Sequence, residues 1–328
     1  MVPAPELIER FRRNLDPLVP ADARLGLAVS GGPDSLALLL LAAAARPGLV
    51  EASTVDHGLR AETPGEAKVV AGLCEQLGVP HAILTVTWKR KPETAIQERA
   101  RVARYRLLGA WAKDRDLGAL ATAHHLDDQV ETFVMRLTRG AGIQGLAGMR
   151  RAVAAPGSDV RLTRPLLGWR RFELENICAD AGLTPVEDPS NLDPQFERVR
   201  VRQALARLPE IDTGAVGRSL AHLGQADAAL RWAAGNEWQR AVTAGDQEVV
   251  YRPDGAPLEI RRRIVALAIG SLANEGRGAE LRGRELDRVL LALRSGGKAT
   301  LRGVLCSGGE QWRFIPAPNR TRPANNLR

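Results

Sequence analysis

The sequence predicts an α/β protein with a doubly wound parallel sheet, followed by a smaller and mainly helical C-terminal domain. Over the first two thirds of the chain, short apolar runs alternate with longer segments of helical periodicity. From about Pro209 onward, Ala, Leu and Arg recur at helical spacing instead. Alternating strands and helices are typical of a parallel sheet covered on both faces. We therefore expect one domain over residues 1–208 and a second over residues 209–328.

The first domain is expected to begin with an amphipathic helix, roughly Glu6 to Leu15. The expected strands are Leu25–Val29, Val50–Val55, His81–Trp88 and Leu117–Ala123, and the helices between and after them are Ser35–Ala45, Thr63–Leu77, Thr94–Lys113 and Asp127–Thr138. Pro165 and Pro185 bracket a further helix, about Arg170 to Ala181. The run VRLTRPLL before it predicts an edge strand or an extended arm.

The second domain is expected to be helical up to a short closing β segment. Residues 296–318 alternate apolar and polar side chains around Gly-rich turns, which predicts a hairpin. Residues 319–328 are expected to form a frayed tail.

Composition limits the class of protein without identifying it. A formal charge of +8, from 46 Lys and Arg against 38 Asp and Glu, suits an anionic partner but equally suits ordinary surface charge. Cys74, Cys178 and Cys306 lie far apart, which argues against a zinc ribbon, an iron-sulfur cluster or a disulfide framework, so we expect core thiols. No secretory signal and no apolar run of about 18 residues occurs, which predicts a cytoplasmic protein with no membrane role. The oligomeric state stays open, with a homodimer among the alternatives.

The first chemical motif is Ser30-Gly31-Gly32-Pro33-Asp34-Ser35, between an expected strand and an expected helix. Glycines there let the backbone approach a phosphate, and the helix N-terminus favours negative charge. The segment lacks the GK[ST] of a Walker loop and the GxGxxG of a dinucleotide site. The structural alternative is a tight Gly-Pro turn whose helix is capped by Asp34 or Ser35.

The six residues SGGPDS resemble the PP-loop of the ATP pyrophosphatases, enzymes that adenylate a substrate oxygen and release pyrophosphate. The resemblance implies the fold of the adenine nucleotide alpha hydrolase-like proteins. It also implies that Ser30, Gly31, Gly32, Pro33, Asp34 and Ser35 bind ATP, with Asp34 as the ligand of Mg²⁺.

The densest group of ionisable residues runs from His124 to Glu131, at the end of the fourth strand and the start of its helix. Asp128 and Glu131 share one helix face by their i, i+3 spacing. The structural alternative is simple dipole caps at the helix N-terminus, and the functional alternative is a His/Asp metal hydrolase site. The segment resembles the GHHxDDQxET signature of the tRNA(Ile)-lysidine synthetases, with Ala123 where glycine is common. The family resemblance implies that Asp128 and Glu131 bind lysine and that His124 contacts the transferring phosphate.

Further segments extend this resemblance over roughly Leu25 to Arg202. The segment Asp56–Arg60 is similar to the family's DHxLR, which implies that Asp56 and His57 lie beside the nucleotide, although a surface loop is the alternative. Ala100–Tyr105 is similar to ARxxRY, with Arg104 as the catalytic cation; a solvated arginine face is the alternative. Other matches are Arg136, Arg139-Gly140, Gly145–Met149, Arg164–Leu167 and Glu187–Asn191. The arginines expected near RNA are Arg139, Arg198, Arg200 and Arg202, the alternative being a solvated basic helix.

Resemblance to this family implies a reaction among ATP, L-lysine and an isoleucine tRNA with a CAU anticodon. O2 of the wobble cytidine attacks the α-phosphate, pyrophosphate leaves, and the amine of lysine displaces AMP at C2. Two other functions stay open: a sulfur-inserting relative that acts on tRNA cytidine, which normally needs reactive or cluster cysteines, and a nucleotide-binding regulator without catalysis.

Overall fold

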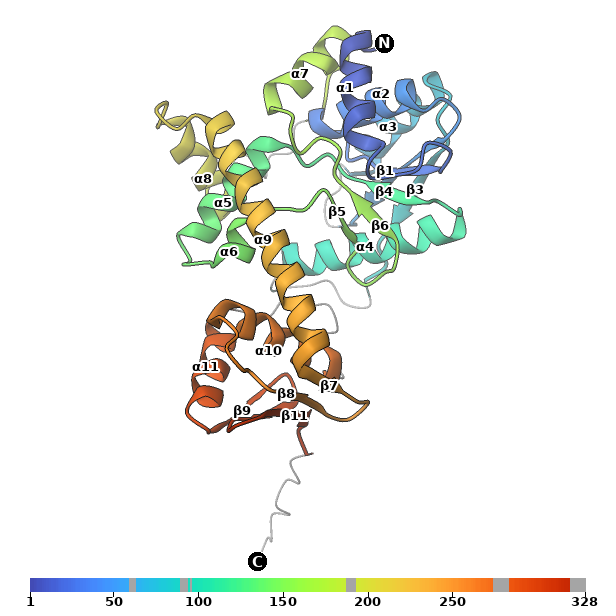
Figure 1. Cartoon of the computed structure of the whole chain (residues 1–328). Helices are drawn as coiled ribbons and strands as arrows, with labels where there is room; N and C mark the ends of the chain where they lie inside the picture. Colours follow the sequence, from blue (N-terminus) through green and yellow to red (C-terminus); the bar gives the residue numbers. More distant parts are fainter. Residues whose placement is uncertain (59–62, 89–93, 95, 187–192, 274–282, 319–328) are drawn as a thin grey trace, which may run out of the picture. The chain divides into compact units, whose positions relative to one another are not determined.

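A computed structural model describes residues 1–58, 63–88, 94, 96–186, 193–273 and 283–318. The chain forms two compact units, one of residues 1–140 and 145–221, and another of residues 141–144 and 222–328 (Figure 1). The division falls inside helix α9 (Thr213–Ala241). The boundary expected after residue 208 stays a prediction.

The first unit is built on a six-stranded sheet in the order β3-β2-β1-β4-β6-β5. All neighbouring strands are parallel except β5 and β6, which are antiparallel. The strands are β1 (Leu25–Ala28), β2 (Val50–Asp56), β3 (His81–Thr85), β4 (Ala119–Ala121), β5 (Ala152–Ala154) and β6 (Arg161–Thr163). The expected doubly wound parallel sheet is confirmed. The run expected as an edge strand forms β6, one place inside the edge, because β5 pairs with its outer side.

The strand order reverses between β1 and β4. The chain proceeds outward from β1 to β2 and β3, and then returns to place β4 on the other side of β1. In open α/β sheets, ligands bind beyond the carboxyl ends of the strands at such a reversal. The loop after β1 is SGGPDS and the segment after β4 contains His124 to Glu131, so both motifs lie at this point.

Two hydrophobic clusters cover opposite faces of the sheet. Leu25 and Leu27 of β1 belong to one cluster, together with buried residues of helices α1 (Pro5–Leu15), α2 (Pro33–Ala45), α3 (Thr63–Gln76) and α7 (Arg171–Asp180). Helix α4 (Ile96–Asp114) packs through Tyr105, Leu108 and Trp111 in the other cluster. Gly26 lies between Leu25 and Leu27 and so faces α4. A Cβ atom at Gly26 would lie 2.8 Å from the Trp111 ring, so glycine is required there.

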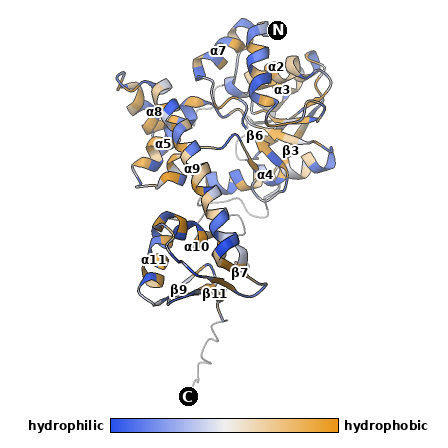
Figure 2. Cartoon of the chain, in the orientation of Figure 1, coloured by the Kyte–Doolittle hydropathy of each residue, from blue (hydrophilic) through white to orange (hydrophobic). Residues whose placement is uncertain are grey.

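Helix α2 differs from the other helices in being almost wholly apolar. Its residues from Leu36 to Ala42 are all buried, and Figure 2 shows hydrophobic residues concentrated along the strands and helices of this core. Such a helix cannot slide or rotate without exposing leucines, at a cost of about 2 kcal/mol for each side chain. Its first turn, which carries Asp34, is therefore held firmly at the end of β1.

Two further helices complete the site region of this unit. Helix α5 (Leu126–Leu137) follows β4, and helix α8 (Glu197–Ala206) packs against it. The short helix α6 (Ile143–Leu146) lies between α5 and β5 along the chain.

The second unit contains a five-stranded antiparallel sheet in the order β7-β8-β11-β10-β9, besides the helices expected from sequence. Its elements after α9 are β7 (Val242–Ala244), β8 (Val249–Tyr251), α10 (Leu258–Leu272), α11 (Gly283–Arg294), β9 (Lys298–Leu301), β10 (Val304–Ser307) and β11 (Trp312–Pro316). The expected hairpin is β9 and β10, joined at Arg302 and Gly303, which both have positive φ as a two-residue hairpin turn requires. β7 and β8 were not expected from the sequence.

Cys74, Cys178 and Cys306 are all buried and free, which confirms the prediction of core thiols. Within the described ranges, no helix combines the length and the apolar character that crossing a bilayer requires.

Candidate active site

The loop after β1 is shaped by one residue in the left-handed region and one hydroxyl. Gly31 has φ +89°, which favours glycine. The Ser35 hydroxyl accepts a hydrogen bond from the Ser30 amide (3.1 Å) and donates one to the carbonyl of Gly32 (2.9 Å). Ser35 thus occupies one amide of the loop itself. Among the described residues, none accepts a hydrogen bond from the amides of Gly31 and Gly32.

The start of helix α2 therefore presents backbone N–H donors that no side chain caps. Gly32 is its N-cap, and no side chain caps its first turn. Pro33 follows at the first helical position, where its missing N–H costs nothing. Free amides and the positive end of the helix dipole together make an anion site. The geometry suits the phosphate contact expected of SGGPDS.

The Asp34 side chain lies in the first turn of α2 and has one unsatisfied oxygen. Oδ2 faces His125 Nε2 at 3.5 Å, whereas Oδ1 is buried and has no hydrogen-bond partner in the part of the chain that is described. An unpaired buried carboxylate oxygen is costly unless a cation or water completes it. Mg²⁺ is usually held by one or two carboxylates together with phosphates and waters, so Asp34 fits that role. Within the described residues, no group of three or more His, Cys, Asp or Glu side chains forms an all-protein metal cage.

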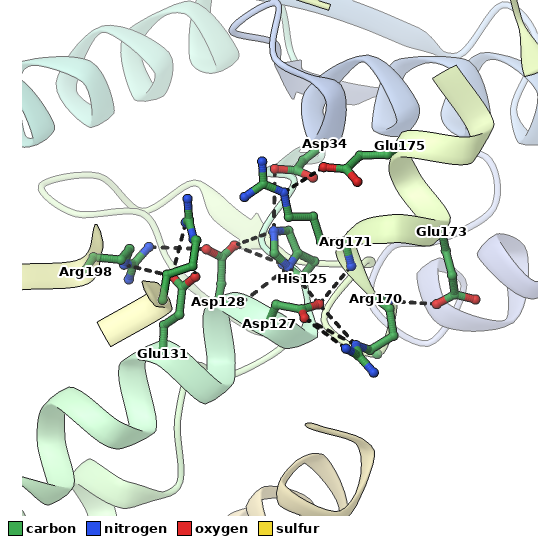
Figure 3. Close-up of polar contacts among 12 residues, drawn as sticks. Asp34, His125, Asp127, Asp128, Glu131, Arg170, Arg171, Glu173, Glu175 and Arg198 are labelled. Carbon is green, nitrogen blue, oxygen red and sulfur yellow. Dashed lines mark hydrogen bonds and ion pairs between the residues drawn. The ribbon is translucent and has the colours of Figure 1, made fainter. Parts of the chain in front are cut away.

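His125 is the N-cap of α5 and the centre of the acidic cluster (Figure 3). Its ring lies within 3.6 Å of three carboxylates, those of Asp34, Asp127 and Asp128. Burial lowers the pKa of His125, but hydrogen bonding to Asp127 and Asp34 and the charge of Asp128 outweigh burial and raise this pKa to about 10. The ring is therefore a buried cation at neutral pH, linking the first turns of α2 and α5.

Protonation of His125 decides between two roles of Nδ1. That nitrogen lies 3.4 Å from the Asp128 amide, as a capping acceptor would, and 3.6 Å from an oxygen of Asp127, as a donor would. A doubly protonated ring can only donate. Because 3.4 Å is long for a cap and three acids surround the ring, we favour the donor role toward Asp127. The other half of the capping box, from the His125 amide to Asp128 Oδ2 at 3.2 Å, holds in either state.

His124 has the opposite electrostatic surroundings, although it is the next residue. Burial lowers its pKa well below the usual value, and the charges of Arg164, Arg104, Arg101 and Arg198 lower it further. The neutral ring bonds the Thr122 hydroxyl through Nδ1 at 2.9 Å. If that hydroxyl donates, the proton lies on Nε2, which then is a donor for an anionic oxygen. This arrangement is compatible with the phosphate contact expected of His124.

Asp128 and Glu131 share one face of α5, as their spacing predicts, and both meet arginines of α8. Arg198 Nη1 is 3.3 Å from Asp128 Oδ1. Arg202 bonds both oxygens of Glu131, at 2.6 and 3.3 Å. Glu131 is only 3% exposed. Two of the arginines expected to contact RNA therefore lie against the two acids expected to bind lysine.

The other two arginines expected near RNA make local contacts. Arg139 pairs with Glu197, and Arg200 bonds the carbonyls of Pro194 and Gln195 at 2.8 and 2.9 Å. Their role toward RNA stays a prediction. The segment Glu187–Asn191, expected from the family resemblance, lies outside the described residues, as do Leu59 and Arg60.

Arg104 lines a cavity of about 370 Å³ on α4. The cavity is also lined by Arg101 from α4 and His57 from the loop after β2, which brings two of the expected segments together. The guanidinium carbons of Arg101 and Arg104 lie 5.0 and 5.1 Å from the centre of the Tyr105 ring. Asp56 instead accepts a hydrogen bond from the Gly58 amide (2.8 Å) and shapes the loop.

Several contacts at the site were not predicted from the sequence. Gln129 bonds both the amide and the carbonyl of Met149, at 2.6 and 3.0 Å, which explains the GLAGM segment as the end of α6 and the turn after it, held against α5. Gly148 permits that contact, because a Cβ atom there would lie 2.6 Å from Gln129. Asp127 faces α7 through contacts with Arg170 and Arg171. These partners lie about 20 or more positions apart in sequence, so no local pattern reveals them.

Comparison with known proteins adds the family. The PP-loop domain family matches residues 5–209. The tRNA(Ile)-lysidine synthase of Novosphingobium aromaticivorans is 47% identical over 311 residues, covering 94% of this chain and 93% of that protein. The chain belongs to the tRNA(Ile)-lysidine synthase family. The family's enzyme from Zymomonas mobilis is 43% identical, with 92% of this chain and 91% of that protein covered.

Solved structures agree with this family at the level of fold. A U34-tRNA thiolase from Methanococcus maripaludis superposes with a TM-score of 0.57 at 18% identity, covering 67% of this chain and 79% of that one. At such identity the likeness concerns the fold alone. Membership of the lysidine synthase family therefore rests on the sequence relatives, and the PP-loop fold rests on both.

Proposed function

We propose that the chain ligates L-lysine to C2 of the wobble cytidine in the CAU-anticodon tRNA(Ile), with ATP converted to AMP and pyrophosphate. The observation that carries this proposal is the meeting of two helix N-termini at the β1/β4 reversal. One presents open amides, the other presents Asp128 and Glu131, and His125 lies between them. This meeting supports adjacent sites for the phosphates of ATP and for the attacking amine of lysine.

The first step joins the cytidine to AMP. O2 of the cytidine attacks the α-phosphorus, and the bond from that phosphorus to the bridging oxygen of pyrophosphate breaks. The amides of Gly31 and Gly32 would hold the phosphates, while Arg104 and the Nε2–H of His124 would donate to oxygens that gain charge in the transition state. Asp34 would hold Mg²⁺, which offsets phosphate charge when bound.

The second step joins lysine to the same carbon. The neutral side-chain amine attacks C2, the C2–O2 bond breaks, and AMP leaves with the oxygen and its electron pair. The amine loses a proton, which Asp128 would accept. Asp128 and Glu131 already accept from arginines, but an ionised carboxylate offers about four lone-pair sites and can accept from an amine as well.

The buried thiols disfavour the sulfur-inserting alternative. Burial raises the pKa of Cys74 and of Cys178 to about 11, whereas a thiol that carries sulfur works as a thiolate of lowered pKa. Cys178 also donates a hydrogen bond to the carbonyl of Pro33 at 3.2 Å. These thiols belong to the packing of α2, α3 and α7.

The decisive experiment supplies all substrates and removes one at a time. The purified chain is incubated with ATP, Mg²⁺, L-lysine and the CAU-anticodon tRNA(Ile), AMP and pyrophosphate are measured, and the tRNA is digested for mass spectrometry of its nucleosides. We expect lysidine in the complete mixture and none without lysine. A thiolated nucleoside, or no tRNA-dependent ATP turnover, would contradict the proposal and favour the sulfur-inserting or the regulatory alternative.

A further inference from the structure

Asp127, the remaining acid in the first turn of α5, faces helix α7 rather than the substrate side. The amide of Arg171, at the start of α7, donates to Asp127 Oδ2 at 2.8 Å. The Arg170 side chain donates to both oxygens, from Nε and Nη2 at 3.3 Å (Figure 3). The backbone adds a link, because the amide of Leu126 donates to the carbonyl of Trp169 at 2.8 Å. The starts of α5 and α7 are thus joined.

Helix α7 is joined equally to the PP-loop helix. Cys178, in the last turns of α7, donates to the carbonyl of Pro33, next to Asp34. Leu174, Ile177 and Cys178 are buried in the same cluster as the leucines of α2. Helix α7 therefore contacts both helices whose first turns form the site.

The start of α7 is itself anchored. Glu173 accepts from the Arg170 amide at 2.7 Å and from Arg10 of α1 at 2.5 Å. Arg10 lies over the ring of Trp169, 4.0 Å from its centre, and donates to the carbonyl of Gly168 at 3.0 Å. Because α7 is held at this end by α1 and along its length by α2, it can fix the position of the start of α5.

Asp127 has little capacity for any other partner. It accepts from Arg170 and from the Arg171 amide, and it faces the His125 ring. Burial raises the pKa of Asp127, but the contacts with His125, the Arg171 amide and Arg170 outweigh burial and lower it to about 2. Since a carboxylate has about four lone-pair sites, these donors nearly saturate it.

We propose that Asp127 is a positioning residue, which fixes the distance between Asp34 and Asp128 by tying α5 to α7 and, through α7, to α2. This inference rests on the proposed function, because the two steps need a phosphate and an amine held in register. A misplacement of about 1 Å can cost about a hundredfold in rate. Asp127 itself touches neither lysine nor the metal.

The test compares Asp127→Asn with a carboxylate of similar structural importance elsewhere in the unit. Glu51 is 4% exposed and pairs with Arg24 and Arg115, at the start of β2 and so at the opposite end of the sheet from the site. Both D127N and E51Q remove one charge held by arginines. We expect both to lower the thermal midpoint, and D127N alone to lower kcat, by about ten- to a hundredfold. The KM values for lysine and for ATP should stay within about twofold, because no ligand contact is lost.

Arg170→Gln reaches the same contact from the other helix. We expect R170Q to lower kcat as D127N does, and the double variant to be no worse than the more impaired single variant, since both changes break one interaction. R170Q also keeps the test decisive if an Asp127 variant fails to fold. Fully additive losses in kcat would overturn the proposal.

Hydrogen exchange supplies a measurement that needs no turnover. In D127N, but not in E51Q, amides in the first turns of α5 and α7 should exchange faster, because the link between these two helices is broken. A D127N protein with normal kcat and normal exchange would show that Asp127 serves stability only. A raised KM for lysine with normal kcat would make Asp127 a lysine ligand instead. Absence of lysidine from the wild-type reaction would refute the proposed function. The hydrogen-exchange comparison would still show whether Asp127 ties α5 to α7.

Discussion

Helices α2 and α5 both begin at the same edge of the sheet. They differ in their first turns, because no side chain caps the amides of α2 whereas side chains cap those of α5. The α2 terminus has a glycine N-cap, no capping side chain and a core of buried leucines behind it. The α5 terminus has a histidine N-cap and a capping carboxylate, and two further acids contact α7 and α8.

Under the proposed function, this difference would let one fold hold an anionic phosphate and a cationic amine side by side. An uncapped terminus keeps its donors for a phosphate, and its rigidity comes from apolar packing rather than from polar contacts. A terminus rich in acids is rigid only while its charges are matched, and here arginines and His125 match them. Under the proposed function, phosphate binding at α2 would need only access, whereas lysine binding at α5 would require sharing carboxylates that already have partners.

The largest expected effect concerns the acidic residues at the N-terminus of helix α5. Asp128→Asn should lower lysidine formation about a thousandfold, because loss of a positioned proton acceptor typically costs about a hundred- to ten-thousandfold. Single-turnover assays should show that adenylation of the tRNA survives better than transfer to lysine. E51Q is the structural control, and turnover of D128N near the wild-type rate would refute the role of Asp128.

The next prediction concerns the charge that links the two termini. The folded pKa of His125, about 10, lies above the ordinary value of 6.5, so its stabilisation is complete below pH 6.5 and is lost as pH rises toward 10. Urea unfolding of the wild type between pH 7 and 9.5 should lose about 1.4 kcal/mol per pH unit more than the His125→Gln variant does. His222→Gln removes an exposed histidine of the second unit and should retain the wild-type slope. Equal slopes in wild type and H125Q would mean that His125 is neutral when folded.

A smaller effect separates two arginines on α8. Arg202→Gln removes both hydrogen bonds to the buried Glu131 and should destabilise the protein by about 2 kcal/mol, the cost of leaving a buried charged group poorly paired. Arg200→Gln loses only bonds to exposed backbone carbonyls and should cost less than about 0.5 kcal/mol. Chemical denaturation measures both, and an equal loss in the two variants would show that Glu131 is satisfied without Arg202.

The smallest effect concerns the uncapped N-terminus of helix α2, where substitutions of two adjacent glycines can be compared. Gly31→Ala forces an L residue into φ +89° at a cost of about 1–2 kcal/mol, so we expect the KM for ATP to rise about tenfold. Gly32→Ala has ordinary φ, and its Cβ would meet only the Ser30 hydroxyl at 3.8 Å. We expect G32A to keep the KM within about twofold of wild type. A rise in KM for G32A alone would place the phosphate against the face of Gly32 that a methyl group fills.

The sequence could predict what depends on local pattern. Leu25 to Ala28, Val50 to Asp56 and the apolar run of α2 are single elements marked by local apolar or β-branched composition and by the turns that bound them, and the sheet order that they form reverses at β1 and β4. The equally short strands β4 and β6 could be located because they lie within longer runs that predict extended chain, whereas β5, β7 and β8 were not expected and their pairing is decided by partners elsewhere in the chain.

Pattern also located the acids but not their partners. The spacing of Asp128 and Glu131 predicted a shared face, which the structure has. That Asp127 faces Arg170, and that Arg198 and Arg202 face the acids, depends on how α7 and α8 fold back on α5 from more than forty positions away. Such contacts are set by packing of the unit as a whole, and no periodicity in the chain encodes them.

The three buried thiols can serve as internal probes of local unfolding. Cys74 and Cys178 lie in the core of the first unit and Cys306 in that of the second, and burial raises the pKa of Cys306 to about 12. A thiol-specific reagent therefore reacts only after the surrounding core opens. Mass spectrometry of alkylated peptides would then time the opening of each unit separately in the unmodified protein. Cys178, bonded to Pro33, would report on the nucleotide loop in particular, and protection of this residue by ATP would measure occupancy without a radioactive substrate.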